Sequence, residues 1–165
     1  LKKFPIFDLI IVSLGFVFRL IIGSFSSIEG LSIWIVIMVF LSALFVILAK
    51  RRGELIIYTY TNKVIRKGIE KYSLNSINRA ILILGFSIVI LYVDYITSSN
   101  FFSTAPNKQS TYWTLINVVL IFTRYFELTF FKNKSGSPIA IIMNDRLIQI
   151  NIVIFISIFY FYIYV

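Results

Sequence analysis

Long runs of apolar residues, separated by short polar segments, form the dominant pattern along this chain. Each run is about 20 residues long, which is the length that an α-helix needs to cross about 30 Å of hydrocarbon. A segment in lipid must be helical, because its backbone polar groups find no water to pair with. The pattern therefore predicts an all-α, polytopic transmembrane helix bundle that forms a single membrane domain over residues 1–165. Its five spanning helices are expected at about residues 4–25, 31–49, 78–98, 112–131 and 147–165.

The connection at residues 50–77 is the longest polar segment, and it carries a helical pattern of its own. Apolar residues recur on one face and basic residues lie largely on the other, which is typical of an interfacial amphipathic helix lying on the membrane. A solvated loop with chance periodicity is the alternative. Residues 72–76 break the pattern and are suited to capping the next helix. The apolar face holds Ile57, Thr61, Val64, Ile65, Ile69 and Tyr72, and the basic face holds Lys63, Arg66, Lys67 and Lys71.

Charge is scarce in this chain and unevenly placed. Charged residues make up 14% of it, against about a quarter in a soluble domain, and the formal net charge is +9. The basic residues flank the apolar runs, so membrane topology explains them better than nucleic-acid binding does. One set of connections carries nearly all of these cations, whereas the turns on the other side carry only Lys108. The positive-inside rule then predicts a multi-pass protein of the plasma (inner) membrane with its long loops in the cytoplasm.

The chain contains no cysteine and no histidine. The first absence excludes disulfides and thiol chemistry. The second removes the usual metal ligand and the usual base at neutral pH. A metal bound here would be a hard cation held by oxygen atoms, such as Mg²⁺.

The strongest local signal for a site is the segment Lys50–Leu55, which directly follows the second apolar run. Arginine presents a planar fork that suits phosphate oxygens, so Lys50, Arg51 and Arg52 are candidates for binding phosphate. Glu54 lies four residues after Lys50 and is a candidate ligand for Mg²⁺ that bridges to substrate phosphates. The alternative is a topology anchor with an incidental carboxylate, and residue types alone favour the anchor slightly.

Among the charged residues inside the predicted spans are Arg19, Asp94, Arg124 and Glu127, and insertion of each such charge costs roughly 3 kcal/mol. Arg124 and Glu127 are three residues apart and can pair on one helix. Arg19 and Asp94 lie at similar depths in different spans, and we expect them to pair across helices. Each of the four is therefore a functional or structural candidate.

Three further charged residues lie near the predicted cytoplasmic ends of the spans. Asp8 suits either the N-terminal end of a helix dipole or the rim of a site. Asp145 precedes the last span, where it can cap the helix or join the same polar rim as Asp8 and Glu54. Arg146 follows it as a further candidate for binding phosphate, and residues 136–138, Gly-Ser-Pro, predict a tight turn just before.

Several short motifs occur in order across nearly the whole chain. They are L-K-x-x-P-x-x-D at residues 1–8, G-F-x-x-R with a later glycine at 15–23, S-x-W at 32–34, K-R-x-x-E-L at 50–55, R-Y at 124–125, G-x-P at 136–138 and D-R-L-I-Q at 145–149. Together they resemble the UbiA superfamily of membrane prenyltransferases, and most closely its decaprenyl-phosphate phosphoribosyltransferase branch.

The resemblance implies nine spanning helices around a cytoplasmic-facing cavity, capped by two polar loops that bind a pyrophosphate through Mg²⁺. This chain would be the C-terminal five-helix portion, a UbiA-like but incomplete bundle. Lys50–Glu54 stands where other members carry their second aspartate motif. The first motif, N-D-x-x-D-x-x-x-D, does not occur in the chain. We therefore expect the main catalytic motif upstream of this chain, and the chain alone to be inactive.

The function implied by the resemblance is transfer of phosphoribose from phosphoribosyl pyrophosphate to a polyprenyl phosphate lipid. Lys50, Arg51, Arg52 and Arg146 would bind phosphates, and Glu54 would assist Mg²⁺. The expected partners are membrane lipid, both substrates and a second copy of the chain, with no nucleic acid. Two alternatives remain. One is a prenyltransferase that attaches a polyprenyl chain to a small aromatic acceptor, and the other is a non-catalytic, truncated membrane protein.

Overall fold

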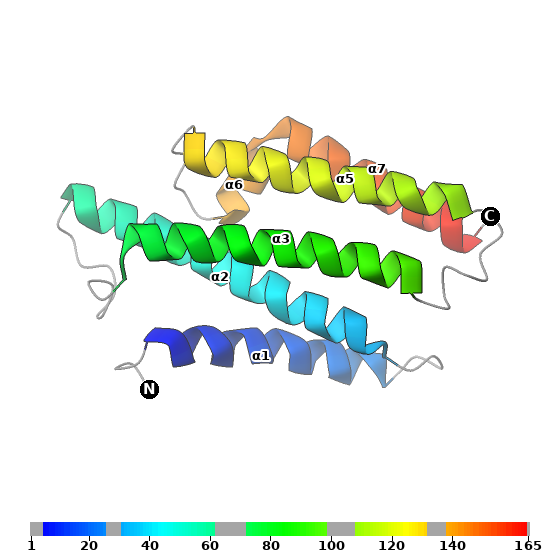
Figure 1. The fold of residues 1–165 in the computed structure, drawn as a ribbon, viewed down its shortest axis with the longest axis horizontal. Helices are drawn as coiled ribbons and strands as arrows, with labels where there is room; N and C mark the ends of the chain where they lie inside the picture. The colour runs from blue at the N-terminus through cyan, green and yellow to red at the C-terminus, as the bar shows by residue number, and fades with distance from the viewer. Residues whose placement is uncertain (1–4, 26–30, 62–71, 99–107, 132–137, 165) are drawn as a thin grey trace. The chain divides into compact units, whose positions relative to one another are not determined.

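The computed structural model describes residues 5–25, 31–61, 72–98, 108–131 and 138–164. Throughout these ranges the regular elements are helices, as Figure 1 shows, so the predicted all-α class is confirmed. The helices are α1 (Pro5–Ser24), α2 (Ile33–Thr61), α3 (Leu74–Ser98), α5 (Lys108–Phe126), the π-helical turn η2 (Glu127–Phe131), α6 (Pro138–Asn144) and α7 (Arg146–Tyr164).

Four of these helices are long and apolar enough to cross a membrane. The apolar stretch of α7, Arg146–Ile158, is shorter than the other four. Many large apolar side chains lie on the surface, among them Phe18, Ile83 and Ile90. A soluble monomer rarely exposes large continuous apolar patches, and such a surface suits lipid. The prediction of an all-α membrane bundle is confirmed.

The chain forms two compact units, Leu1–Ile88 and Val89–Val165, with the boundary inside α3. In the first unit, α1 and α2 run antiparallel beside each other (Figure 1). On α1, the residues Leu9, Ser13 and Val17 are buried at intervals of four, which places them on one face of the helix. Ser13 donates a hydrogen bond to the carbonyl oxygen of Leu9 at 2.9 Å, so its buried hydroxyl is satisfied.

The second helix differs from the expectation at its C-terminal end. The predicted connection beginning at Lys50 is instead a continuation of α2, which runs for 29 residues to Thr61. At about 1.5 Å per residue the helix is roughly 43 Å long, more than the hydrocarbon thickness. Lysine, arginine, glutamate and leucine are strong helix formers, so a polar composition does not end the helix. The rest of the predicted interfacial helix, residues 62–71, lies outside the described residues.

The third helix begins at a serine cap. Ser73 Oγ accepts a hydrogen bond from the backbone N–H of Ser76 at 3.1 Å, which satisfies one of the free donors of the first turn. The predicted capping role of residues 72–76 is confirmed, and α3 starts at Leu74 rather than at the predicted residue 78.

In the second unit, α5 and α7 run antiparallel beside each other (Figure 1). The hydroxyl of Tyr92, on α3, donates a hydrogen bond to Thr114 Oγ1 on α5 at 2.8 Å. The Tyr92 ring also lies 6.5 Å from the ring of Phe155 on α7, between centroids. Residues 138–144, which lie between the predicted fourth and fifth spans, form the short helix α6. It begins with Pro138, at the position where a missing N–H costs least.

Candidate functional site

The first polar cluster lies in the first unit, on the C-terminal half of α2 and the first turn of α1. Arg51 Nη1 donates to Glu54 Oε2 at 2.5 Å, and Arg51 Nη2 donates to Asp8 Oδ2 at 3.2 Å. Asp8 is on α1, so this guanidinium joins the two helices. Because Arg51 is buried, its charge depends on these two carboxylates for compensation. We call Arg51, Glu54 and Asp8 the first triad.

The two residues beside Arg51 differ sharply in exposure. Arg52 is buried, and its Nε donates to Asn78 Oδ1 on α3 at 2.7 Å. Lys50 is exposed and has no hydrogen-bond or ion-pair partner among the described residues. Of the three cations at this segment that are predicted to bind phosphate, Lys50 is therefore the one with an exposed side chain.

The carboxylates of the first triad do not form a cation site by themselves. Asp8 and Glu54 both face the Arg51 guanidinium, which already occupies them. Among the described residues, no group of three or more acidic, histidine or cysteine side chains is placed to hold a metal ion. The residues described here thus do not fit Mg²⁺ without oxygen atoms from elsewhere, and Mg²⁺ stays a prediction that rests on the resemblance.

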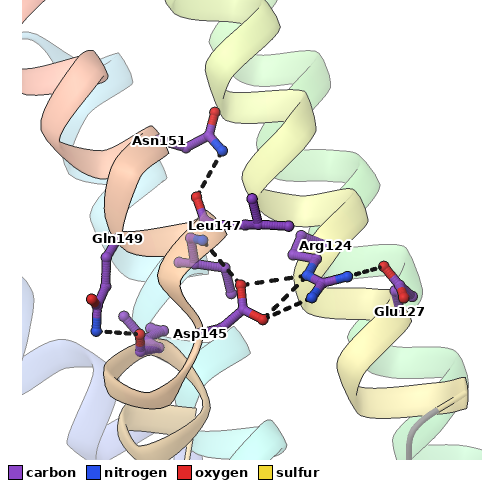
Figure 2. A network of polar contacts seen from close by, with 8 residues as sticks. Arg124, Glu127, Asp145, Leu147, Gln149 and Asn151 are labelled. Carbon is purple, nitrogen blue, oxygen red and sulfur yellow. Dashed lines mark hydrogen bonds and ion pairs between the residues drawn. The ribbon is translucent and has the colours of Figure 1, made fainter.

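The second polar cluster lies in the second unit and is drawn in Figure 2. Arg124 Nη1 donates to Glu127 Oε2 at 2.6 Å, which confirms the predicted pair on one helix. Arg124 Nη2 donates to Asp145 Oδ2 at 2.9 Å, and Nε lies 3.3 and 3.4 Å from the two oxygens of the same carboxylate. Arg124, Glu127 and Asp145 form the second triad.

Asp145 also caps α7, as predicted. Its Oδ1 accepts a hydrogen bond from the backbone N–H of Ile148 at 3.1 Å, the usual geometry of an N-cap. On the other side of the corner, Gln149 Nε2 donates to the carbonyl oxygen of Met143 at 2.6 Å, close to the end of α6 (Figure 2). The corner between α6 and α7 is thus held from both sides and attached to α5 through Arg124.

The same charges shift the pKa of Asp145. Hydrogen bonds from the Arg124 guanidinium, and then from the Ile148 N–H, hold the pKa of the Asp145 carboxyl below its usual 3.8. Burial acts in the opposite direction but is outweighed. Asp145 therefore remains charged, as both the ion pair and the cap require.

The two triads share a local pattern that the sequence-based argument did not identify. Both are built on R-x-x-E-L, at residues 51–55 and 124–128. In each, the arginine donates from Nη1 to the glutamate three residues later and from Nη2 to an aspartate at the start of another helix. The repeat of the five-residue pattern was the available signal. Gln149, which holds the α6–α7 corner, belongs to the D-R-L-I-Q motif, whereas no sequence pattern pointed to Asn78, which binds Arg52.

The remaining predicted site residues are placed as follows. The Arg19 guanidinium lies 5.5 Å from the centroid of the Phe16 ring on the same helix. Asp94 is on α3 in the other unit, so the expected pair with Arg19 stays a prediction. Arg146 is exposed at the first position of α7 and has no hydrogen-bond or ion-pair partner within the described ranges.

Comparison with known proteins gives two relatives, and no protein-family model matches. The chain is 27% identical over 155 residues to a decaprenyl-phosphate phosphoribosyltransferase of Mycolicibacterium smegmatis, covering 91% of this chain and 48% of that protein. It is 23% identical over 152 residues to a protein of the same name from Corynebacterium glutamicum, covering 90% of this chain and 44% of the relative. The chain thus spans about half the length of the curated relatives it matches. The predicted resemblance to decaprenyl-phosphate phosphoribosyltransferases is confirmed by these two relatives of that name.

The first prediction concerns the buried charge of the first triad. Replacing Arg51 by Met leaves Asp8 and Glu54 without the cation that they share, and breaking a buried pair in this way costs about 3–5 kcal/mol. Lys50→Met is the matched control, because it removes the neighbouring but exposed cation and should change stability by about 0.5 kcal/mol or less. The measurement is denaturant unfolding of the purified protein in detergent. Equal losses in the two variants would show that the ion pairs of Arg51 contribute no more to stability than an exposed cation does.

The second prediction separates the two roles of Asp145. Asparagine caps a helix as well as aspartate does but cannot form the ion pair, whereas alanine does neither. Both Asp145→Asn and Asp145→Ala should lower the melting temperature, and the alanine variant should lose about 1 kcal/mol more. Identical melting temperatures would contradict the capping role.

The third prediction follows from the lowered pKa of Asp145. Its stabilising contribution is complete above the pKa of the unfolded chain, near 3.8, and is lost as pH falls through the lower pKa of the folded state. The difference in melting temperature between the native chain and Asp145→Asn should therefore be constant from about pH 7 to 5 and shrink below about pH 4. A difference that persists unchanged to about pH 3 would show that the charge of Asp145 does not stabilise the fold.

Proposed function

From this relationship to decaprenyl-phosphate phosphoribosyltransferases, we propose that the protein is an integral membrane transferase of the UbiA type. In this proposal it transfers phosphoribose from phosphoribosyl pyrophosphate to a polyprenyl phosphate lipid. The observation that carries the proposal is that the similarity extends over about nine-tenths of the chain. Apolar spanning helices suit a lipid substrate, and the cations at the end of the second span suit phosphate.

The exposed cations are the ones that first meet the phosphates. Lys50 and Arg146 are exposed in the structure, and each stands beside a triad residue, Arg51 or Asp145. Arg52 is buried, lies close to Lys50 in the sequence and adds positive potential, whereas the charge of Arg51 is offset by Asp8 and Glu54. Arg51 also fixes Glu54, so the carboxylate is oriented before a substrate arrives.

The proposed chemistry is a single displacement. An oxygen of the lipid phosphate attacks the anomeric carbon of the ribose, the bond from that carbon to the pyrophosphate oxygen breaks, and pyrophosphate leaves with the bonding electron pair. Charge accumulates on the departing pyrophosphate, so cations fixed in advance lower the barrier. In this proposal, Lys50 of the first unit and Arg146 of the second unit each bind phosphate oxygens. The buried guanidinium of Arg52, held by Asn78, keeps the potential around Lys50 positive.

The fourth prediction tests this assignment in the full-length protein in membrane vesicles. Transfer of labelled phosphoribose to the lipid is measured for Lys50→Gln, Arg146→Gln and the control Arg79→Gln. Arg79 is also an exposed cation, but its guanidinium donates to the carbonyl oxygen of Asn75 on its own helix. Losing a charge-assisted hydrogen bond to a phosphate should lower kcat/KM by about tenfold or more, with little change in the control.

Three results would decide against the proposal or against its residues. Transfer that is unaffected in both site variants would remove Lys50 and Arg146 from the site. Equal losses in all three variants would indicate a general effect of surface charge. A full-length protein that transfers no phosphoribose, but attaches a polyprenyl chain to an aromatic acceptor or has neither activity, would overturn the proposed reaction.

A further inference from the structure

Arg124 donates different numbers of hydrogen bonds to its two carboxylates. Asp145 receives hydrogen bonds from both Nη2 and Nε of Arg124 and one from the backbone N–H of Ile148, and its side chain is 12% exposed. Glu127 receives its Arg124 hydrogen bond from Nη1 alone, and its side chain is 42% exposed. In Figure 2 the two carboxylates lie on opposite sides of the guanidinium. The Nη1 side of Arg124 is therefore the accessible side.

The first triad has the same arrangement but not the same access. The Arg51 side chain is 7% exposed, whereas that of Arg124 is 24% exposed. The glutamate three residues later is also better covered in the first triad, where the Glu54 side chain is 15% exposed. Two arginines with the same pair of carboxylate types thus differ in whether a ligand can reach them, and Arg124 is the reachable one.

The second triad holds one carboxylate more than Arg124 needs for neutralisation. Arg124 carries one positive charge and faces two carboxylates, so the second triad has a net charge of −1 when both are ionised. One carboxylate is enough to neutralise the guanidinium, and Asp145 is already fixed for that purpose by the cap of α7. A phosphate monoester carries about −1.5 to −2 charges at neutral pH, more than the carboxylate it would replace.

The helical turn that carries Glu127 gives a second, independent observation. Glu127 begins the π-helical turn η2, and the buried hydroxyl of Thr129 in this turn has no hydrogen-bond partner among the described residues. Six other helical hydroxyls donate instead to the carbonyl oxygen four residues earlier, those of Ser13, Thr59, Thr61, Thr97, Thr123 and Ser157. A π turn shifts the carbonyl oxygens from their α-helical positions, and such turns are frequent at functional sites. The turn that carries Glu127 therefore departs from the regular helix and, among the described residues, leaves one buried hydroxyl unsatisfied.

We propose that Arg124 is a phosphate-binding residue whose Nη1 is occupied by Glu127 in the absence of ligand, and that a phosphate monoester takes the place of the Glu127 carboxylate there. Asp145 keeps its contacts with Nε and Nη2, so the guanidinium stays oriented and α7 stays capped. No covalent bond changes in this exchange. The inference rests on the proposed function for the identity of the ligand, since both proposed substrates carry such a group. Arg124 lies within the apolar span Trp113–Phe131, which favours the phosphate of the lipid over the soluble one.

The test is calorimetric titration of the full-length protein in lipid nanodiscs with a short-chain polyprenyl monophosphate. Glu127→Gln removes the competing charge and keeps the side-chain shape, so it should tighten phosphate binding by about tenfold. The corresponding polyprenyl alcohol should bind both proteins equally. Asp94→Asn is the matched control, because it also removes one carboxylate from a spanning helix.

Arg124→Lys completes the set, since lysine keeps the charge but lacks the fork of donors that holds Asp145 and phosphate together. It should weaken phosphate binding by about tenfold. A gain in Glu127→Gln cannot arise from misfolding, so the proposal can be judged even if Arg124→Lys folds poorly. Unchanged phosphate affinity in Glu127→Gln, or the same gain in Asp94→Asn or with the alcohol, would overturn it.

A parallel titration with phosphoribosyl pyrophosphate identifies the source of the phosphate. A gain for the lipid phosphate alone supports the exchange with the lipid substrate. A gain for phosphoribosyl pyrophosphate alone supports the exchange but assigns Arg124 to the soluble substrate. Phosphoribosyl transfer is measured separately on the native protein. Loss of the proposed function therefore appears as absent transfer, and loss of this inference appears as unchanged binding.

Discussion

The constraint on which the structure depends is that an arginine placed inside an apolar bundle must find its counter-charges within the protein. Arg51 and Arg124 both meet it with a carboxylate one helical turn away and a second carboxylate from another helix. The partner on the same helix comes at little conformational cost, whereas the second joins two helices. In both units, therefore, the charge that would be most costly to leave unpaired is also the one that ties helices together. The arginines are therefore neutralised only when the apolar helices pack together.

The second carboxylate in each triad also has a role in its own helix. Asp8 lies in the first turn of α1, where the helix dipole favours negative charge, and Asp145 caps α7. The arginine thus holds a helix by its N-terminal end, which fixes where that helix begins as well as what it packs against. For α7 the effect extends backwards, because Gln149 binds the end of α6 and so orders the short helix before the corner.

The interactions that could be predicted from the sequence are those between residues close together in the chain. Apolar runs of spanning length gave the membrane bundle, and the spacing of three residues gave the Arg124–Glu127 pair. The caps at Ser73 and Asp145 were also foreseeable, since each side chain acts within three residues of its own position. The pairing of Asp8 with Arg51 spans 43 positions and depends on how α1 docks against α2, so local pattern could not give it. The continuation of α2 past Lys50 differs from the prediction because polar residues do not by themselves end a helix, and most of these residues are good helix formers.

The repeated R-x-x-E-L pattern shows why residue types alone did not distinguish a structural charge from a functional one. Arg51 and Arg124 have the same partners by type, the same spacing and nearly equal ion-pair distances to their glutamates. They differ in exposure and in the turn that carries the glutamate, which is regular in α2 and π-helical in η2. In a well-covered triad, a carboxylate that left the arginine would remain buried as an unpaired charge. Such a triad is therefore suited to holding helices together. An accessible triad with one exposed carboxylate can exchange that carboxylate for a ligand, and only the packed structure tells the two apart.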